Sequence, residues 1–353
     1  MPRALISWIQ SADDLVMSSP DVASIGIVIP VHGGYHRVIA ETLDAVKLQT
    51  ASPRATVVVI DGPAPDLERV VRDHEADVEI LILPENSGGP ATPRNVGADH
   101  LRKKHDLEAI WFLDADDIPH PRFLEVVSRS MKVNPEHDLY CTGFDLWTKK
   151  ELRPAFSDTP GSELDTVPVD LEWYLARTGS ILPSFTVVRT RSFSSIRESE
   201  EPFDPVYENN QDYDMFVRIL HLKQGLRIEW QGGAYRMHAD AISAQGSRAW
   251  LCRSCVNRDL QSWFLKLGEE ELSERMRSAE GSAIRRAARH LWRKDGSGDR
   301  LTALRLLIDD IKENRSVRSL LLMVLMPLGR DAQLRRIPLG QDTRLVSNPA
   351  DGS

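Results

Sequence analysis

The chain has 353 residues, of which 41% are hydrophobic and 27% are charged, and its formal net charge is -8. This composition is typical of a folded globular protein that is long enough for one large α/β domain and a smaller appendage. The acidic balance argues against a nucleic-acid-binding protein, which would carry a basic stripe, but it does not exclude a phosphate-bearing substrate whose charge a metal ion neutralises.

Predicted strands and helices alternate from residue 25 to residue 113. Short apolar runs rich in β-branched residues predict buried strands at 25–30, 56–60, 78–83 and 110–113. Apolar residues at helical spacing predict helices at 35–49, 67–75 and 93–104. This alternation predicts βαβ units and a mainly parallel sheet, which binds ligands at the carboxyl ends of its strands.

The second half of the chain is predicted to become mostly helical. Residues 185–188 and 226–230 are predicted strands on either side of a predicted helix at 208–221. From about 249 to 318 the pattern is helical, with an interruption near Gly296-Ser297-Gly298. We therefore expect a leader at 1–22, a sheet domain at 23–248, a helical region at 249–330 and a loose tail at 331–353.

The sequence predicts a cytoplasmic protein. Its N-terminus lacks the features of a signal peptide, and no stretch reaches the ~18 apolar residues that span a bilayer. Cys252 and Cys255 form a C-x-x-C without a second pair, which predicts thiols on a helix face rather than a zinc site. The basic segment 285–294 and the apolar run 320–328 indicate either a helical cap on the sheet domain, which we favour, or peripheral docking on an anionic membrane.

A cluster of aspartates, Asp114-Ala115-Asp116-Asp117, directly follows the predicted strand at 110–113. In an extended segment this spacing places Asp114 and Asp116 on the same side, where their charges repel unless a cation lies between them. Mg²⁺ or Mn²⁺ at such a site takes one or two carboxylates and completes its coordination with water and substrate phosphates. The alternative is a solvated acidic turn, but the position at a strand end favours a metal site.

Three further segments carry polar side chains that suit a binding site. The loop 86–90 has a Gly pair that lets its backbone approach a ligand, and it precedes Arg94, whose guanidinium suits a phosphate. Asp212 lies where a predicted helix opens, so it is either a helix cap or a general base. His238, with Ser243 five residues later, is either an ordinary core or surface histidine or a contact to a metal or phosphate.

In chain order, these segments resemble the family 2 glycosyltransferases over roughly residues 24–245. The matching motifs are Ile29-Pro30-Val31, Asp61-Gly62, N-x-G-G followed by R-N-x-G, D-A-D-D, Phe203-Asp204, an E-D-like segment on a helix, and Y-R-x-H-x-x-x-x-S. Each motif is loose alone, but the ordered set is specific.

The resemblance implies a GT-A-type α/β fold, with a mainly parallel sheet flanked by helices and a C-terminal helical extension. It implies contacts to a nucleotide sugar from Pro30, Val31, Asp61, Arg94, Asp114 and Ala115. It also implies a divalent metal, Mn²⁺ or Mg²⁺, at Asp116 and His238, with Asp117 close by and Ser243 in the histidine motif. Asp212 would be the catalytic base. Gln211 replaces the acid that usually precedes this base, and Asp214 is the alternative base.

The implied activity is a single inverting displacement that moves a sugar from a nucleotide-diphosphate donor to the hydroxyl of a glycan, polysaccharide or lipid-linked acceptor. A non-catalytic sugar-nucleotide-binding or scaffold protein on the same fold is the alternative, and the presence of Asp116, Asp212 and His238 disfavours it. A nucleotidyltransferase would need an early Gly-rich phosphate loop, for which Gly33-Gly34 is too short. A dehydrogenase would need G-x-G-x-x-G after the first strand, where it is missing.

Overall fold

The computed structural model describes residues 23–148, 156, 164–237, 246–293, 297–314 and 316–328. The leader predicted at 1–22 and the tail predicted at 331–353 lie outside these residues.

The first half of the structure is a parallel sheet whose strands are separated by helices, as predicted. Its elements are β1 (Ile25–Val31), α1 (Ile39–Lys47), β2 (Ala55–Ile60), α2 (Pro65–Asp73), β3 (Glu79–Ile82), α3 (Ala91–Lys104) and β4 (Ala109–Phe112). These strands lie in the order β3-β2-β1-β4, and every pair among them is parallel. The apolar side chains of β1, β2 and β4 are buried on both faces, which explains the continuous apolar runs of these strands in the sequence.

The second half continues the same sheet with mixed strand directions. Its strands are β5 (Ile118–Pro119), β6 (Leu139–Thr148), β7 (Thr166–Val169), β8 (Thr186–Arg189) and β9 (Gly225–Met237). The full order is β3-β2-β1-β4-β8-β6-β9-β5, and β7 pairs with β9. The pair β4–β8 is antiparallel and the pair β6–β9 is parallel, so the sheet is parallel on one side and mixed on the other. The α/β fold with helices around the sheet is confirmed.

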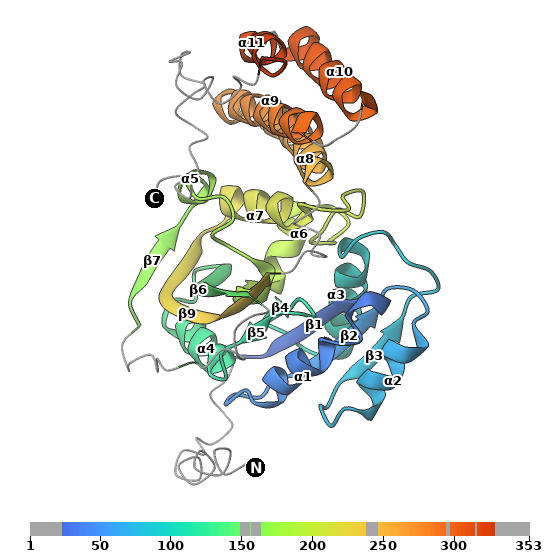
Figure 1. Ribbon diagram of the computed structural model, residues 1–353. Helices are drawn as coiled ribbons and strands as arrows, with labels where there is room; N and C mark the ends of the chain where they lie inside the picture. The colour runs from blue at the N-terminus through green and yellow to red at the C-terminus, as the bar shows by residue number, and fades with distance from the viewer. Residues whose placement is uncertain are drawn as a thin grey trace.

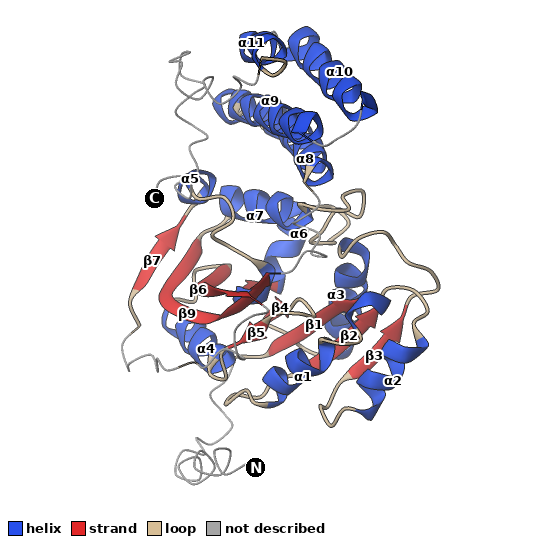
Figure 2. Ribbon diagram, in the orientation of Figure 1, coloured by secondary structure: helices blue, strands red, loops and turns tan. Residues whose placement is uncertain are grey.

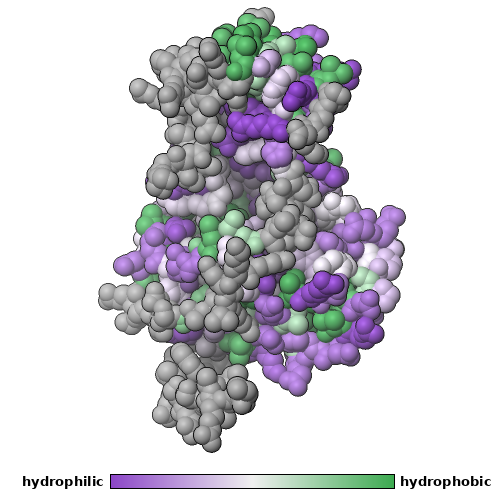
Figure 3. Space-filling view, in the orientation of Figure 1, coloured by the Kyte–Doolittle hydropathy of each residue, from purple (hydrophilic) through white to green (hydrophobic). Residues whose placement is uncertain are grey.

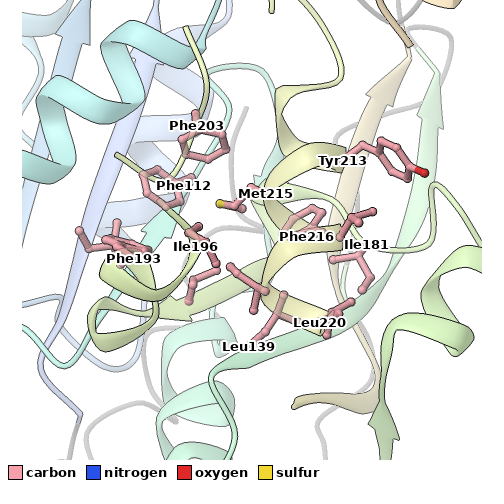
Figure 4. Packing of buried hydrophobic residues seen from close by; sticks show 14 of the residues in the cluster. Phe112, Leu139, Ile181, Phe193, Ile196, Phe203, Tyr213, Met215, Phe216 and Leu220 are labelled. Atoms are coloured by element: carbon pink, nitrogen blue, oxygen red, sulfur yellow. The ribbon is translucent and has the colours of Figure 1, made fainter. Parts of the chain in front are cut away.

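Two layers of helices cover the sheet (Figures 1 and 2). On one face α1, α2 and α4 (Phe123–Val133) bury Leu43, Leu67 and Val126 against the strands. On the other face lie α3 and α7 (Gln211–Leu222), with α6 (Phe193–Ile196) beside them. There the ring of Phe112 on β4 lies near those of Phe193 and Phe203, and Phe216 of α7 belongs to the same apolar cluster (Figure 4).

The C-terminal helices stack above α7 (Figure 1). They are α8 (Ser247–Lys266), α9 (Glu270–Arg293), α10 (Ser297–Asn314) and α11 (Val317–Leu325), and the short α5 (Leu171–Ala176) lies beside α7 below them. Phe264 of α8 and Met276 of α9 belong to the same apolar cluster as Phe216 of α7. The predicted C-terminal helical extension is therefore confirmed, and its first two helices share a core with the sheet.

The apolar run at 320–328 forms most of α11, which has a buried and an exposed face. Leu322 and Met326 pack with α9 and α10 in a small separate core. Leu320 and Val324 are exposed, and the space-filling view shows apolar residues gathered over α10 and α11 (Figure 3). In the part of the chain that the structure describes, no helix combines the length and the apolarity that a membrane span requires.

Candidate functional site

A cavity of about 360 Å³ opens at the carboxyl ends of β1, β2 and β4. These strands are neighbours in the sheet, so the residues that follow them meet at one edge. Nine of the residues predicted from the sequence line this cavity: Pro30, Val31, Asp61, Arg94, Asp114, Ala115, Asp116, Gln211 and Asp212.

Asp61 is held in place by the loop that follows β3. Its carboxylate accepts two hydrogen bonds from Ser87, one from the backbone N–H at 2.8 Å and one from the hydroxyl at 3.0 Å. The chain can turn directly after Asp61 because Gly62 adopts φ +86°, and a Cβ there would lie 2.8 Å from the Asn86 nitrogen. The predicted Gly-pair loop is thereby fixed to the end of β2.

Arg94 joins α3 to the aspartate cluster. Its Nη2 lies 2.5 Å from Asp114 Oδ1, and the side chain is almost fully buried. Its Nε and Nη1 atoms are buried and have no hydrogen-bond partner among the described residues. This guanidinium lies at the cavity wall, donates to Asp114 and has further N–H donors without a partner. Such a group is suited to an anionic ligand.

Within the aspartate cluster, Asp116 lines the cavity and Asp117 does not. Asp117 is buried, and its Oδ1 accepts the backbone N–H of Arg236 at 2.9 Å. Burial, followed by the charges of Asp116 and Asp114, raises the pKa of Asp117 well above its usual range. Asp117 therefore lies close to Asp116, but its side chain faces β9 and anchors the turn rather than lining the cavity.

Arg236 is a residue whose contacts the motif Y-R-x-H did not reveal. Its Nε donates to the Asp116 carbonyl at 2.7 Å, and its Nη2 lies 2.8 Å from Glu41 Oε2 on α1. The end of β9 is thus fastened to the aspartate cluster. His238, two residues later, and Ser243 lie outside the described residues, so the structure places neither of them.

Asp212 and Asp214 lie in the first turn of α7 but have different surroundings. The helix starts after Asn210, which adopts φ 61°, a left-handed conformation that asparagine tolerates. Asp212 is partly buried and lines the cavity. Burial raises the pKa of its carboxyl, and the nearby Arg94 charge opposes this effect.

Asp214 is fully buried and faces away from the cavity. Its carboxylate pairs with Arg197, and its Oδ1 lies 2.9 Å from Arg218 Nε one turn later. The alternative prediction of Asp214 as base is therefore wrong, since both oxygens are engaged by arginines in the core.

The cavity is also lined by residues that were not among the predicted site residues, including Tyr35, Glu208 and Arg248. Burial and the charges of Asp116, Asp114 and Asp117 raise the pKa of Tyr35. Arg248 opens α8 and forms an exposed ion pair with Glu208. No local pattern marks Arg248, because it reaches the cavity only through the packing of α8 on the sheet domain.

The carboxylates at the cavity are hard oxygen donors, the type that Mg²⁺ and Mn²⁺ prefer. The described residues contain no group of three or more His, Cys, Asp or Glu side chains arranged to hold a metal ion. Of the predicted aspartate cluster, Asp114 and Asp116 line the cavity, and Asp114 already contacts Arg94.

Comparison with known proteins agrees with this geometry. Residues 26–169 match the family model described as Glycosyl transferase family 2. A curated relative described as "Uncharacterized glycosyltransferase", from Rickettsia bellii (strain RML369-C), is 29% identical over 112 residues. The matched segment is 32% of this chain and only 16% of the length of that relative.

Solved structures share the fold over most of the chain. The crystal structure of S. aureus TarS 1–349 in complex with UDP-GlcNAc has a TM-score of 0.58 and 15% identity, and the match covers 89% of this chain and 87% of that one. The same fragment in complex with UDP has a TM-score of 0.57 and 14% identity, with the same coverage of both chains. The sheet and the C-terminal helices are thus a known arrangement, and residues 26–169 are similar to glycosyl transferase family 2.

Proposed function

We propose that this protein is a nucleotide-sugar-dependent glycosyltransferase that moves a sugar to an acceptor hydroxyl in one inverting displacement. The observation that carries the proposal is one cavity that brings Asp61, Arg94, Asp114, Asp116 and Asp212 together from four separate segments. This set offers contacts for a nucleotide, charges for a diphosphate and a carboxylate that can act as base.

The donor is bound along the ends of β1, β2 and β4. Pro30 and Val31 form the apolar floor for the nucleotide base, and Asp61, oriented by Ser87, accepts a hydrogen bond from a base N–H. Arg94 and Asp114 contact the ribose and phosphates. The complexes of S. aureus TarS with UDP and UDP-GlcNAc support a uridine nucleotide as the first donor to test.

A divalent cation fits the aspartate cluster. Asp114 and Asp116 would hold it, together with the donor phosphates and the predicted ligand His238. The fit rests on the donor set and on the crowding of negative charge, since the charges of Asp114 and Asp116 raise the pKa of both Asp117 and Tyr35. When bound, the metal would stabilise charge on the leaving diphosphate.

Asp212 acts as the general base. Its carboxylate takes the proton of the acceptor hydroxyl while the acceptor oxygen attacks the anomeric carbon and the nucleoside diphosphate leaves from the opposite face. The raised pKa of Asp212 makes it a stronger base than an exposed aspartate. Asp214 stays in the core and takes no part in this proton transfer.

The place and domain division of the enzyme are further proposals. We propose that it is located in the cytoplasm. Its catalytic sheet domain would span residues 23–248, and the helical region at 249–330 would pack on that domain. Peripheral docking through the exposed face of α11 predicts flotation with liposomes of anionic lipid. Absence of flotation would remove the membrane contact and leave the catalytic proposal intact.

The experiment that tests the function is donor hydrolysis, because many transferases slowly transfer to water and no acceptor need be known. UDP-, GDP- and dTDP-sugars are incubated with Mn²⁺ or Mg²⁺, and nucleoside diphosphate release is measured for wild type, Asp116→Ala and Asp99→Ala. Asp99 is a matched control because it lies on the exposed side of α3, paired with Lys103.

We expect metal-dependent release for wild type and Asp99→Ala, and its loss in Asp116→Ala. Metal-dependent donor binding in calorimetry, without release and without transfer to any glycan tested, would identify a non-catalytic sugar-nucleotide-binding protein. If no donor binds, the interpretation of the aspartate cluster as a metal and donor site is refuted.

A further inference from the structure

The C-terminal helices bring a positive charge to the donor cavity. Arg248 lies in the first turn of α8, and it lines this cavity together with Glu208, its partner in an ion pair. Its Nε lies 2.9 Å from Glu208 Oε2, and its Nη2 contacts the same oxygen. The function proposed above uses neither residue, although both border the space in which the donor is proposed to bind.

Hydrogen bonds to the segment before α7 fix the start of α8 beside the donor cavity. Asn210 Nδ2 donates to the Ala249 carbonyl at 3.1 Å, and the Cys252 thiol donates to the Asn209 carbonyl. Asn209 itself lines the donor cavity. The position of Arg248 is therefore set by the docking of α8 on the segment that leads into the helix of the proposed base.

The donor cavity has an excess of negative charge. Among its described lining residues, the arginines are Arg94 and Arg248, and the acidic residues are Asp61, Asp114, Asp116, Glu208 and Asp212. Arg94 already donates to Asp114, so part of its charge is balanced before any ligand binds. A nucleoside diphosphate adds further negative charge, and moving that charge out of water is costly unless cationic groups pair with it. Besides a metal ion and Arg94, the cavity offers Arg248 for this pairing.

The ion pair between Arg248 and Glu208 can be exchanged at little cost. The side chain of Arg248 is 67% exposed and that of Glu208 is 52% exposed, and ion pairs this exposed contribute little to stability. A guanidinium binds phosphate oxygens through two parallel N–H donors, and a diphosphate carries more negative charge than one carboxylate. The buried Nε and Nη1 of Arg94, which have no partner among the described residues, also point to an anionic ligand in this cavity.

We propose that Arg248 binds the diphosphate of the donor, and that it exchanges Glu208 for a phosphate oxygen when the donor enters. As the bond from the anomeric carbon to the diphosphate oxygen breaks, its electron pair goes to the diphosphate, whose growing charge Arg248 stabilises. Without donor, Glu208 holds Arg248 and so competes with the phosphates. This inference rests on the proposed function, because it adds a residue from α8 to the donor site of the same transferase.

The test is calorimetric binding of UDP to the full chain in the presence of Mn²⁺, with uridine as the comparison ligand that lacks phosphate. Arg248→Gln should weaken UDP binding about tenfold, the effect of one charge-assisted hydrogen bond, and leave uridine binding unchanged. Glu208→Gln should strengthen UDP binding about two- to fivefold, because Arg248 no longer has to leave an ion pair. In the Arg248→Gln background, Glu208→Gln should give no such gain.

Arg69→Gln is the matched control, since Arg69 is 69% exposed, pairs with Asp66 and does not line the cavity. Equal UDP affinity of wild type, Arg248→Gln and Arg69→Gln would overturn the role of Arg248 alone and leave the donor site standing. A gain from Glu208→Gln that keeps its full size in the double variant would also overturn the exchange, because it would come from the removal of negative charge alone. If wild type binds none of UDP, GDP and dTDP, the donor site itself fails.

Discussion

Asp212 and Asp214 show how two identical residues, two positions apart on one helix, acquire opposite roles. Residues two apart in an α-helix point about 200° away from each other, so one faces the cavity when the other faces the core. Asp212 lies at the cavity, and Asp214 is buried between Arg197 and Arg218. Spacing alone could not decide which is the base, because the rotation of α7 about its axis is set by packing.

Replacing Asp212 with Asn should lower kcat for sugar transfer by about 100-fold or more, since a general base contributes at least that much. In wild type, kcat/KM should fall as the pH drops through the raised pKa of Asp212, at a higher pH than for an ordinary aspartate. The pH profile of transfer, measured with a fixed donor, checks both. An acid limb unchanged in Asp212→Asn would assign the base elsewhere.

The same variant should be more stable than wild type at neutral pH. A group whose pKa is raised by folding destabilises the folded state once the pH exceeds that pKa, and Asn removes this cost. The gain in Tm should vanish when the pH falls below the pKa of an unfolded aspartate.

Asp214→Asn should instead lower the free energy of unfolding by about 3 kcal/mol, because it leaves buried arginine charge uncompensated. Arg197 keeps a second partner, Asp204, at 3.1 Å, which places the effect at the lower end of the usual range. Urea denaturation measures it. Asp66→Asn is the control, an exposed partner of Arg69 that should change stability by less than about 0.5 kcal/mol. A similarly small change in Asp214→Asn would contradict the pairing.

At the scale of elements, α3 carries Arg94 to the cavity because it lies very close to the sheet. Gly97, one turn after Arg94, makes this approach possible. A Cβ at that position would lie 2.5 Å from Val28 Cγ1 on β1 and 3.0 Å from Val59 Cγ2 on β2. Both valines are fully buried and have no space to move.

Gly97→Ala should therefore destabilise the protein by about 1–2 kcal/mol. Alanine favours a helix over glycine by about 1 kcal/mol, but overpacking costs up to about 3 kcal/mol, so the steric term wins. Thermal unfolding measures the change, with Asp99→Ala on the exposed face of α3 as the control. A variant as stable as the control would mean that α3 can shift away from β1 and β2.

For the whole molecule, the sheet domain and the first C-terminal helices form one core. Phe264 of α8 and Met276 of α9 pack in the same cluster as Phe216 of α7, whereas α10 and α11 have a small core of their own. The expected boundary at 248/249 therefore separates segments that are joined by apolar packing.

Phe264→Ala should lower the free energy of unfolding by about 3–5 kcal/mol and leave a single transition. Urea unfolding followed by circular dichroism and by tryptophan fluorescence should give coincident curves. Leu265→Ala, whose side chain is 60% exposed, is the control and should change little. A separate early transition confined to helical signal would instead make α8 and α9 an independent unit.

The amino-acid sequence was sufficient for the four parallel strands, their helices and the polar residues after each strand. These follow from local periodicity and from the rule that parallel strands present their carboxyl ends at one edge. The sequence was not sufficient to predict α4 or β6. In the case of β6, the strand Leu139–Thr148 is buried at its start and partly exposed later, so its pattern has no single period. Nor did it predict β9 beyond residue 230, where pairing with β5 and β6 extends the strand.

The burial and the orientation of individual side chains came only with the folded chain. Asp117 and Asp116 are adjacent in sequence, yet Arg236, 119 positions after Asp117, holds one inside while the other faces the cavity. Arg248 of α8 reaches the cavity from a helix far along the chain. Strand and helix formation depends on neighbours in sequence, whereas the surroundings of a side chain depend on neighbours in space, and those are set by how the C-terminal helices dock on the sheet.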